Sequence, residues 1–138
     1  MDTNKVTKTI ITSPAIYKPV GPYSQAVLVD KTLYVSGVLG MTADAQLVTG
    51  GIKAQTKQAL DNLQHILVAG GASLQSVVKT TILLARLEDF AVFNKVYAEY
   101  FPKNPPARAT YEVSRLPKDA AVEIEAIAIS GNLVESAA

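Results

Sequence analysis

The sequence predicts a single α+β domain in which two helices pack on one face of a mixed β-sheet. Three observations predict it. The chain of 138 residues is long enough for one core but too short for two. Its hydrophobic content of 49% against 18% charged residues is that of a globular protein. Strand-like segments alternate with two helix-like ones, which favours helices layered on a sheet. The expected domain spans residues 1–138, with a core at about 7–130 and flexible ends, the C-terminal one at 131–138.

The first third of the chain predicts a hairpin preceded by a loop. Residues 7–12 are compatible with a short leading strand. Residues 13–25 contain three prolines and a glycine, so we expect an ordered loop there. Two β-rich runs, "AVLVD" and "TLYVSGVL", flank Asp30-Lys31, which indicates a two-residue turn between strands.

Two helices are predicted, at 51–69 and 88–101. In the first, apolar residues recur at helical spacing and Gly70-Gly71 provides a C-terminal stop. In the second, acidic residues stand in the first turn, where the helix dipole favours them, and Pro102 ends the helix. Its aromatic stripe consists of Phe90, Phe93, Tyr97, Tyr100 and Phe101.

Three further strands complete the prediction. Residues 76–85 and 121–130 are mostly apolar, and residues 107–116 alternate. In the alternating strand, Ala107, Ala109, Tyr111 and Val113 share one face, while Arg108, Thr110, Glu112 and Ser114 share the other. The expected order is β-β-α-β-α-β-β, with room for one extra leading strand. Because two helices cover only one sheet face and mean hydropathy is high at +0.19, we expect another subunit to cover the second face.

Composition excludes several classes of function. A net charge of +1 provides no basic field for nucleic acid, and the absence of cysteine excludes thiolate chemistry and cysteine metal sites. The single histidine, His65, cannot form a histidine metal site alone, so no metal is expected. The N-terminus lacks the apolar stretch of a secretory signal, and no run reaches membrane-spanning length. The expected compartment is the cytosol, with mitochondrial or nuclear pools left open.

Two charged residues stand out in strand-like segments. Arg108 follows "PPA" at the start of a strand. It is either a solvated arginine paired with Glu112 or Glu123, or a clamp for a carboxylate, which its guanidinium fork matches bidentately. Glu123 interrupts the apolar run "VEIEAIAI", where a buried carboxylate is costly unless paired. Glu123 and Glu125 share a strand face with apolar residues. This mixed face is equally compatible with the rim of a pocket and with an ordinary amphipathic edge strand.

Three smaller features have an ordinary structural interpretation beside a functional one. Tyr23 in "GPYSQA" is a turn tyrosine that packs its ring on the sheet, or a pocket residue. Gly37 in "SGVLG" marks a bulge, or a bare backbone that a small ligand can approach. Asn94, on the aromatic helix, is expected to cap or bridge.

Several motifs taken together carry a family resemblance. In order along the chain they are "GPYSQA", "LYVSG", "QTKQALDNLQHIL", "VVKTTILL", "DFAVFNKVYAEYF" and "PPARATYEVSRLPKDAAVEIEAIAI". From about Thr7 to Ser130 the chain closely resembles the RidA/YjgF family of small imine deaminases, and "LYVSGVLGM" and "VVKTTILLA" resemble its animal branch.

The resemblance implies a fold, an assembly and a reaction. The implied fold is chorismate-mutase-like, in a homotrimer whose sheets form a central barrel with three clefts between subunits. The implied reaction is hydrolysis of 2-iminopropanoate and 2-iminobutanoate to 2-oxo acids and ammonia, with no cofactor. The substrates arise from enamines that pyridoxal-phosphate-dependent serine and threonine dehydratases release, so the activity protects against these reactive compounds.

The resemblance also assigns roles to residues. In the family, the residue matching Arg108 binds the substrate carboxylate, and the one matching Glu123 positions or activates water. Tyr23 is expected to line the cleft from the neighbouring subunit, and the backbone of Gly37 to face the ligand. The backbone N–H of Thr110 is expected to bind the carboxylate or imine, and Asn94 to be a supporting residue. Two positions depart from many family members: Val38 replaces a glutamine, and Thr110 stands where bacterial members have cysteine. Both departures leave substrate preference open.

Two alternative functions compete with the deaminase. Animal relatives have been described as translation inhibitors with ribonuclease activity, but near-neutral charge and a single histidine give this little physical support. A chaperone-like trimer that binds partners is compatible with the apolar surface. Arg108 together with Glu123 favours the enzyme.

Overall fold

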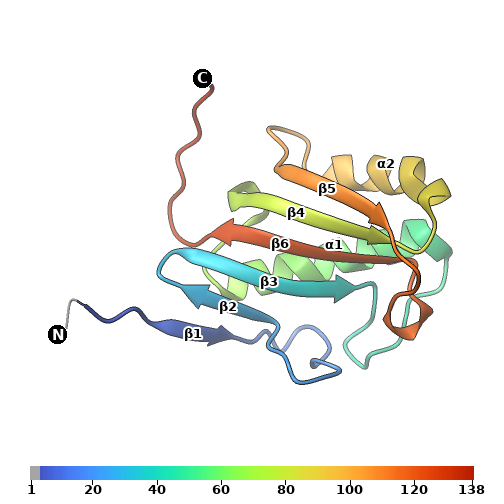
Figure 1. The fold of residues 1–138 in the computed structure, drawn as a ribbon, viewed down its shortest axis with the longest axis horizontal. Coiled ribbons are helices and arrows are strands. Elements are labelled where there is room, and N and C mark those ends of the chain that lie inside the picture. Colours follow the sequence, from blue (N-terminus) through green and yellow to red (C-terminus); the bar gives the residue numbers. More distant parts are fainter. Residues whose placement is uncertain (1–3) are drawn as a thin grey trace.

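The computed structural model describes residues 4–138 and shows a six-stranded sheet with two helices (Figure 1). The elements are β1 (Lys8–Ile11), β2 (Ala26–Val29), β3 (Thr32–Leu39), α1 (Gly51–Ala69), β4 (Val77–Leu84), α2 (Phe90–Tyr100), β5 (Ala107–Glu112) and β6 (Val122–Ile129). Three 3₁₀ turns accompany them, at Leu74–Ser76, Leu87–Asp89 and Pro117–Asp119. Within residues 4–138, no helix has the length and apolar character needed to cross a membrane.

The sheet is mixed, with the strand order β1-β2-β3-β6-β4-β5. Helix α2 connects β4 to β5, and these two strands are parallel; the other neighbours are antiparallel. The last strand, β6, inserts between β3 and β4 (Figure 1). β5 therefore lies at one edge of the sheet, with one side of its backbone unpaired.

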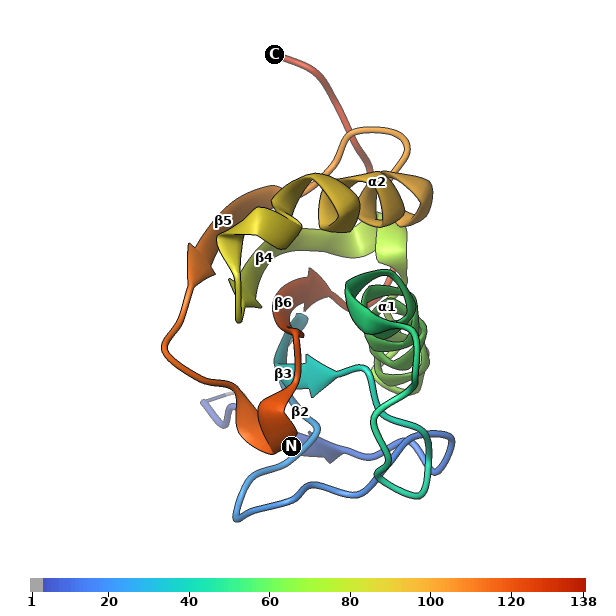
Figure 2. The same cartoon turned by 90° about the vertical axis from the view of Figure 1, so that its right-hand side faces the viewer.

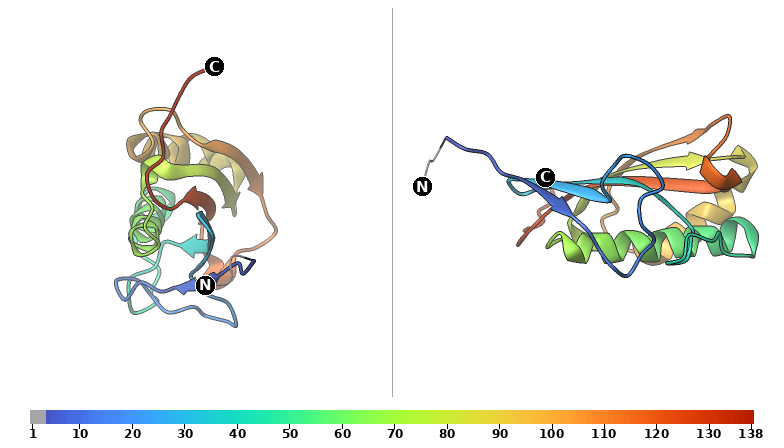
Figure 3. Two further views of the ribbon diagram at one scale, coloured as in Figure 1. Left: turned by 90° about the vertical axis from the view of Figure 1, so that its left-hand side faces the viewer. Right: turned by 90° about the horizontal axis from the view of Figure 1, so that it is seen from below.

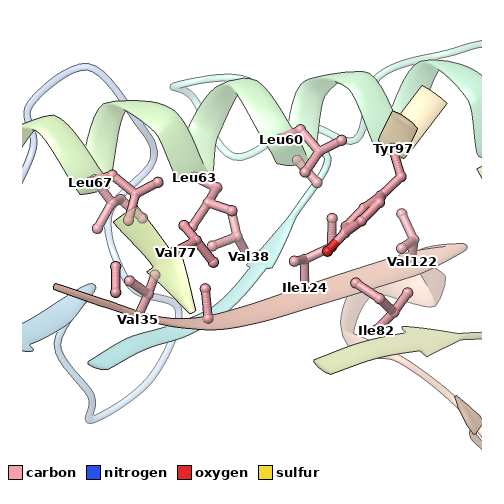
Figure 4. Close-up of a cluster of buried hydrophobic side chains, with 14 of the residues drawn as sticks. Val35, Val38, Leu60, Leu63, Leu67, Val77, Ile82, Tyr97, Val122 and Ile124 are labelled. Atoms are coloured by element: carbon pink, nitrogen blue, oxygen red, sulfur yellow. The ribbon is translucent and has the colours of Figure 1, made fainter. Parts of the chain in front are cut away.

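Both helices lie on the same side of the sheet (Figure 2), and α1 runs along the strands on that side (Figure 3, right). Leucines at helical spacing on α1 point into the core toward alternate residues of β3 and β6 (Figure 4). The largest fully buried side chains include Leu60, Leu63, Leu67, Ile82, Phe93 and Ile124. Burying these side chains is the main favourable term that holds the helical layer on the sheet.

The structure confirms the predicted element order, the mixed sheet and the extra leading strand. The helix at 51–69 has the predicted bounds, and it ends as expected: the Gly70 N–H donates to Ile66 O and Leu67 O, and Gly71 adopts φ +76°. The turn at Asp30-Lys31 joins β2 to β3, with Asp30 at φ +54°.

Two predicted bounds were wrong by two residues or more, and several others differ from the structure by one residue. The strand expected at 107–116 ends at Glu112, because β4 ends at Leu84 and the chain loses its partner after Val113 N–H donates to Leu84 O. The second helix begins later than expected, at Phe90, after the 3₁₀ turn at Leu87–Asp89. The expected tail at 131–138 has no helix or strand and is exposed, whereas residues 1–3 of the expected flexible N-terminus lie outside the described residues.

The second face of the sheet, which we call the open face, carries large side chains that no other element covers. Tyr34 on β3 is 49% exposed, and Tyr111 on β5 is 56% exposed. A depression of about 230 Å³ beside Tyr34, over β3, β6 and β4, is lined by Tyr34, Val35, Lys79, Thr81, Glu125, Ala126 and Ile127. The expected cover of this face by another subunit stays a prediction.

Asn62 ties the end of β3 to α1. Its side-chain N–H₂ donates to Leu39 O at 3.0 Å and to Met41 O at 2.9 Å, and its Oδ1 accepts from Gln58 at 2.9 Å. Asn62 is buried, so no solvent can replace these bonds. It therefore fixes the point at which the chain leaves the sheet.

We predict that Asn62→Ala destabilises the fold by about 2–4 kcal/mol, because two carbonyl groups lose their donors in the interior. Urea denaturation at a fixed protein concentration measures the change. Gln64→Ala, at an exposed position of the same helix, is the control and should change the midpoint little. If both substitutions lower the free energy of unfolding equally, the Asn62 hydrogen bonds are not what holds the end of β3 against α1.

Candidate active site

The predicted site residues form two groups, on opposite faces of the sheet. Strand alternation directs the side chains of Arg108 and Thr110 toward α2. It directs Glu123 to the open face, because its neighbours Val122 and Ile124 point into the helical core. Arg108, Asn94 and Thr110 form the first group. Tyr23, Gly37 and Glu123 form the second.

Arg108 lies half-buried beneath α2. Its Nη2 donates to Asn94 Oδ1 at 2.7 Å, so the asparagine bridges α2 to β5 as expected. Three rings of α2 surround the guanidinium, whose Cζ is 4.9 Å from the ring centroid of Tyr97 and 5.6 Å from those of Phe90 and Phe93. Aromatic faces attract a cation and limit its hydration, so they hold Arg108 in place without neutralising it.

No carboxylate among residues 4–138 pairs with Arg108. Neither of the two partners considered from the sequence is paired with Arg108. Glu112 accepts the N–H of Leu87 at 2.8 Å, and Glu123 lies on the opposite face. The interpretation of Arg108 as a strand arginine paired with either glutamate is therefore wrong. A half-buried guanidinium without a counterion has the charge and the donors to bind an anion.

Thr110 adds two unsatisfied polar groups beside Arg108. Its Oγ1 is buried and has no hydrogen-bond partner among residues 4–138. Val113 N–H points toward β4, where it bonds Leu84 O, so by strand alternation the N–H of Thr110 points to the free edge of β5. This backbone donor is available to a ligand at the edge, as the resemblance implies.

Gly37 and Glu123 lie against each other on the open face. A Cβ built on Gly37 would stand 2.7 Å from Glu123 Cδ and 2.9 Å from its Cγ and Oε1. The pairing of β3 with β6 shifts between Val35 and Val38, so the bulge expected at this glycine is confirmed. The bulge and the missing side chain give the Glu123 carboxyl its place.

Burial raises the pKa of the Glu123 carboxyl, and the nearby charge of Glu125 raises it further. A carboxylate with a raised pKa is a better proton acceptor from water than an ordinary surface glutamate. Glu123 has no ion-pair or hydrogen-bond partner within residues 4–138, so its oxygens are free for water or substrate.

Tyr23 lies near Gly37 and Glu123, at the end of the sheet that we call the Glu123 corner. Its ring is 43% exposed, its hydroxyl accepts the N–H of Val20 at 3.4 Å, and it lines a small cavity together with Tyr17 and Gly37. Tyr17 was missed in the sequence. It lies in the proline-containing loop at 13–25, where nothing in the local pattern distinguished a buried tyrosine from a surface one.

This arrangement has two chemical capacities. The Arg108 group can grip a small anion, and the Glu123 group can hold and activate water. One protomer cannot apply both to one molecule, because the sheet separates them. Among residues 4–138, no three histidine, cysteine, aspartate or glutamate side chains are placed to hold a metal ion.

Comparison with known proteins places these residues in a family context. Residues 12–130 match the family described as Endoribonuclease L-PSP. A human 2-iminobutanoate/2-iminopropanoate deaminase is 54% identical over 115 residues, which is 83% of this chain and 84% of the human one.

Two solved structures extend the similarity to the fold. The RidA structure from the Antarctic bacterium Psychrobacter has a TM-score of 0.85 at 42% identity and covers 88% of this chain and 98% of its own. E. coli TdcF with bound serine has a TM-score of 0.84 at 32% identity, with 89% and 99% covered. These likenesses confirm the expected chorismate-mutase-like fold.

We predict that Gly37→Ala leaves stability nearly unchanged but displaces the Glu123 carboxyl, because the clashing atoms are the end of a flexible side chain. A crystal structure of the variant and its denaturation midpoint measure the two effects. Gly40→Ala is the contrasting variant, since its Cβ would meet the backbone of Gln55, with Gln55 Cα at 2.7 Å. We expect it to destabilise the fold by about 1–3 kcal/mol. If the Glu123 carboxyl occupies the same position in Gly37→Ala as in the wild type, the prediction is wrong.

Proposed function

Because the chain belongs to the Endoribonuclease L-PSP (RidA/YjgF) family, we propose that it is an enzyme that hydrolyses 2-iminopropanoate and 2-iminobutanoate to 2-oxo acids and ammonia. The observation that carries the proposal is Arg108, a half-buried guanidinium held by Asn94 and aromatic rings but without a carboxylate partner. The name of the human relative supports the reaction, and the serine bound to E. coli TdcF supports a ligand with a carboxylate.

The proposed mechanism begins with orientation of the substrate. A 2-imino acid carries one fixed negative charge, and the fork of Arg108 binds it through two parallel hydrogen bonds. The N–H of Thr110, on the free edge of β5, supplies a further donor to the carboxylate or imine. Fixing the carboxylate in this way leaves the adjacent C=N carbon in a defined position, so that water can approach from one direction.

Glu123 provides the proton transfers. It accepts a proton as water adds to the C=N carbon, and it returns the proton to nitrogen, giving a tetrahedral carbinolamine. Glu123 then takes the proton of the hydroxyl and delivers a proton to the amino nitrogen; as the carbon–nitrogen bond breaks, ammonia leaves and the hydroxyl oxygen becomes the carbonyl of the 2-oxo acid. Each turnover consumes one water molecule, and no electrons are transferred to an outside acceptor. These steps need no cofactor.

The separation of the two groups supports a site shared between subunits. Arg108 of one protomer and Glu123 of another can reach the same molecule only where the edge strand β5 meets the open face of a neighbour. The exposed Tyr34 and Tyr111 on that face support such a contact. We therefore propose the homotrimer with three clefts, in which Tyr23, Gly37 and Glu123 face the Arg108 group of the adjacent protomer.

The substrate suggests its source. Elimination from serine or threonine yields enamines that tautomerise to these two imino acids, so pyridoxal-phosphate-dependent dehydratases are the proposed suppliers, and protection from reactive intermediates is the proposed role. The cytosolic location remains a prediction.

A ribonuclease or translation-inhibitor function has less support. His65 is exposed on α1 near Gln58 and Asp61, and it belongs to neither group of site residues. No observation favours the chaperone-like alternative.

We predict that Arg108→Ala lowers kcat/KM for imine hydrolysis by roughly thirtyfold or more, the cost of removing one member of a buried charge pair. The assay couples threonine dehydratase in excess to this protein and follows 2-oxobutanoate above the spontaneous rate. Arg115→Ala is the control, because Arg115 lies exposed and pairs with Asp119. Full activity in correctly assembled Arg108→Ala would exclude the carboxylate clamp.

We also predict complementation between inactive variants. Arg108→Ala and Glu123→Gln, denatured together and refolded at equal amounts, should regain activity. About a quarter of the interfaces would then combine an intact Arg108 with an intact Glu123 from different protomers in a cyclic assembly. The refolded single variants are the controls. If the mixture is no more active than they are, the site does not combine these residues across an interface.

A further inference from the structure

The hydroxyl of Tyr17 lies in the corner that holds Glu123, and the mechanism above does not use it. The ring is only 5% exposed and packs in a second apolar cluster with Leu39, Met41, Leu116 and Ala120. This cluster closes the end of the sheet where β3 leaves its partners. A tyrosine fills the space no better than a phenylalanine would, so its hydroxyl needs a separate explanation.

The hydroxyl accepts the backbone N–H of Leu39 at 2.8 Å. The pairing of β2 with β3 stops at Ala26 and Val35, so the edge of β3 that β2 covers has no strand partner beyond that point. The Tyr17 oxygen satisfies one backbone donor that the sheet leaves unpaired. This bond fixes the hydroxyl relative to the last residue of β3.

The hydroxyl and Glu123 lie at the same end of the sheet, on either side of β3, because the Leu39 N–H that bonds Tyr17 points to the β2 side and Glu123 lies on β6. Leu39 is the register partner of Glu123 across β3 and β6, so their side chains share the open face. Tyr17 also lines the small cavity that Gly37 lines, and Gly37 lies directly against the Glu123 carboxyl. Tyr17 is thus connected to Glu123 in two ways, through Leu39 and through Gly37.

The hydroxyl has a proton to donate. Burial raises the pKa of Tyr17 to about 12; the Leu39 N–H lowers it in part, while Tyr23 and Glu123 raise it electrostatically. The phenol is therefore protonated at neutral pH. Among residues 4–138, nothing accepts that proton.

Few other titratable or charged groups lie near Glu123 and the Tyr17 hydroxyl. Glu125 stands two residues along the same strand, and Tyr23 comes from the same loop as Tyr17. The register partner of Glu123 on β4 is the apolar Leu83. In the turn before β6, Arg115 and Asp119 pair with each other. Within residues 4–138 of one chain no cation pairs with Glu123, and in the proposed trimer the Arg108 of the adjacent protomer is assigned to the substrate carboxylate, so Tyr17 is the candidate donor for the Glu123 carboxylate.

We propose that Tyr17 is a positioning residue for Glu123: its hydroxyl, fixed by Leu39, donates its proton toward the Glu123 carboxylate across one water molecule and holds the carboxylate in the orientation for proton transfer. The catalytic consequence rests on the proposed deaminase function, whereas the contact itself does not. A donor to the carboxylate favours its charged form, so the hydroxyl lowers the pKa that burial and Glu125 raise.

The first test is a titration that needs no activity. Glutamate labelled with ¹³C at Cδ is followed by NMR in the full-length protein, and the Glu123 signal is assigned by its loss in Glu123→Gln. We expect Tyr17→Phe to shift the Glu123 titration to higher pH. Tyr100→Phe is the matched control, since it also removes one structural hydroxyl, which bonds Asp61 at 2.7 Å between α2 and α1, and it should leave the titration unchanged.

The second test measures imine hydrolysis. Tyr17→Phe should lower kcat by roughly two- to tenfold, the range for one neutral hydrogen bond, and leave KM nearly unchanged because Arg108 still binds the carboxylate. The acid limb of the pH profile should move to higher pH together with the NMR titration. If Tyr17 only supports the fold through its bond to Leu39, Tyr17→Phe would lower the melting temperature. It would then shift neither the acid limb of the pH profile nor the Glu123 titration.

The outcomes separate the two proposals. An unchanged Glu123 titration in folded Tyr17→Phe overturns the positioning role, whatever the activity. A shifted titration in a protein whose wild type shows no imine hydrolysis supports the contact and rejects the deaminase function. Circular dichroism confirms that each variant is folded before it is titrated.

Discussion

The alternation of side chains along the strands is the constraint on which the rest of this structure depends. One sheet face is buried under α1 and α2, so every strand residue faces either the helices or the open side. Arg108 falls on the helical side and Glu123 on the open side. A shift of β5 or β6 by one residue would reverse either placement and bury the wrong set of side chains. The same constraint that builds the core therefore places Arg108 and Glu123 on opposite faces of the sheet, which is why the proposed site combines them across a subunit interface.

The energetics of Arg108 explain how its guanidinium stays ordered although no carboxylate among residues 4–138 pairs with it. Leaving a half-buried guanidinium without a carboxylate costs free energy, since part of its hydration is lost. Contacts with aromatic faces recover about 0.5–2 kcal/mol each, and the bond to Asn94 satisfies one donor while adding no charge. An aspartate at position 94 would stabilise the arginine more, and it would also neutralise it. The asparagine keeps the arginine ordered and its positive charge available.

The sequence was sufficient to predict the order of the elements and most of their bounds, because hydrophobic periodicity and glycine stops are local signals. It also singled out Arg108 and Glu123, since a charge in an apolar strand is conspicuous. It could not predict which face each residue occupies relative to the helices, because that depends on how the strands are ordered in the sheet. The end of β5 at Glu112 depended on the length of its neighbour β4, and the location of Tyr17 depended on packing against Leu39 and Leu116, which lie far away in the sequence.

The Glu123 corner shows how a strand irregularity can serve chemistry. Leu39 is the register partner of Glu123, but the pairing shift between Val35 and Val38 brings Gly37 against the carboxyl, where any side chain at position 37 would occupy its space. The glycine leaves that space free, and β3 continues to Leu39, beyond its last pair with β2 at Val35. The backbone donor freed at Leu39 then needs a partner, which the loop at 13–25 supplies through Tyr17. One local departure from ideal pairing thus accounts for the space around the carboxyl, while the end of the β2 pairing accounts for the backbone donor that the Tyr17 hydroxyl satisfies.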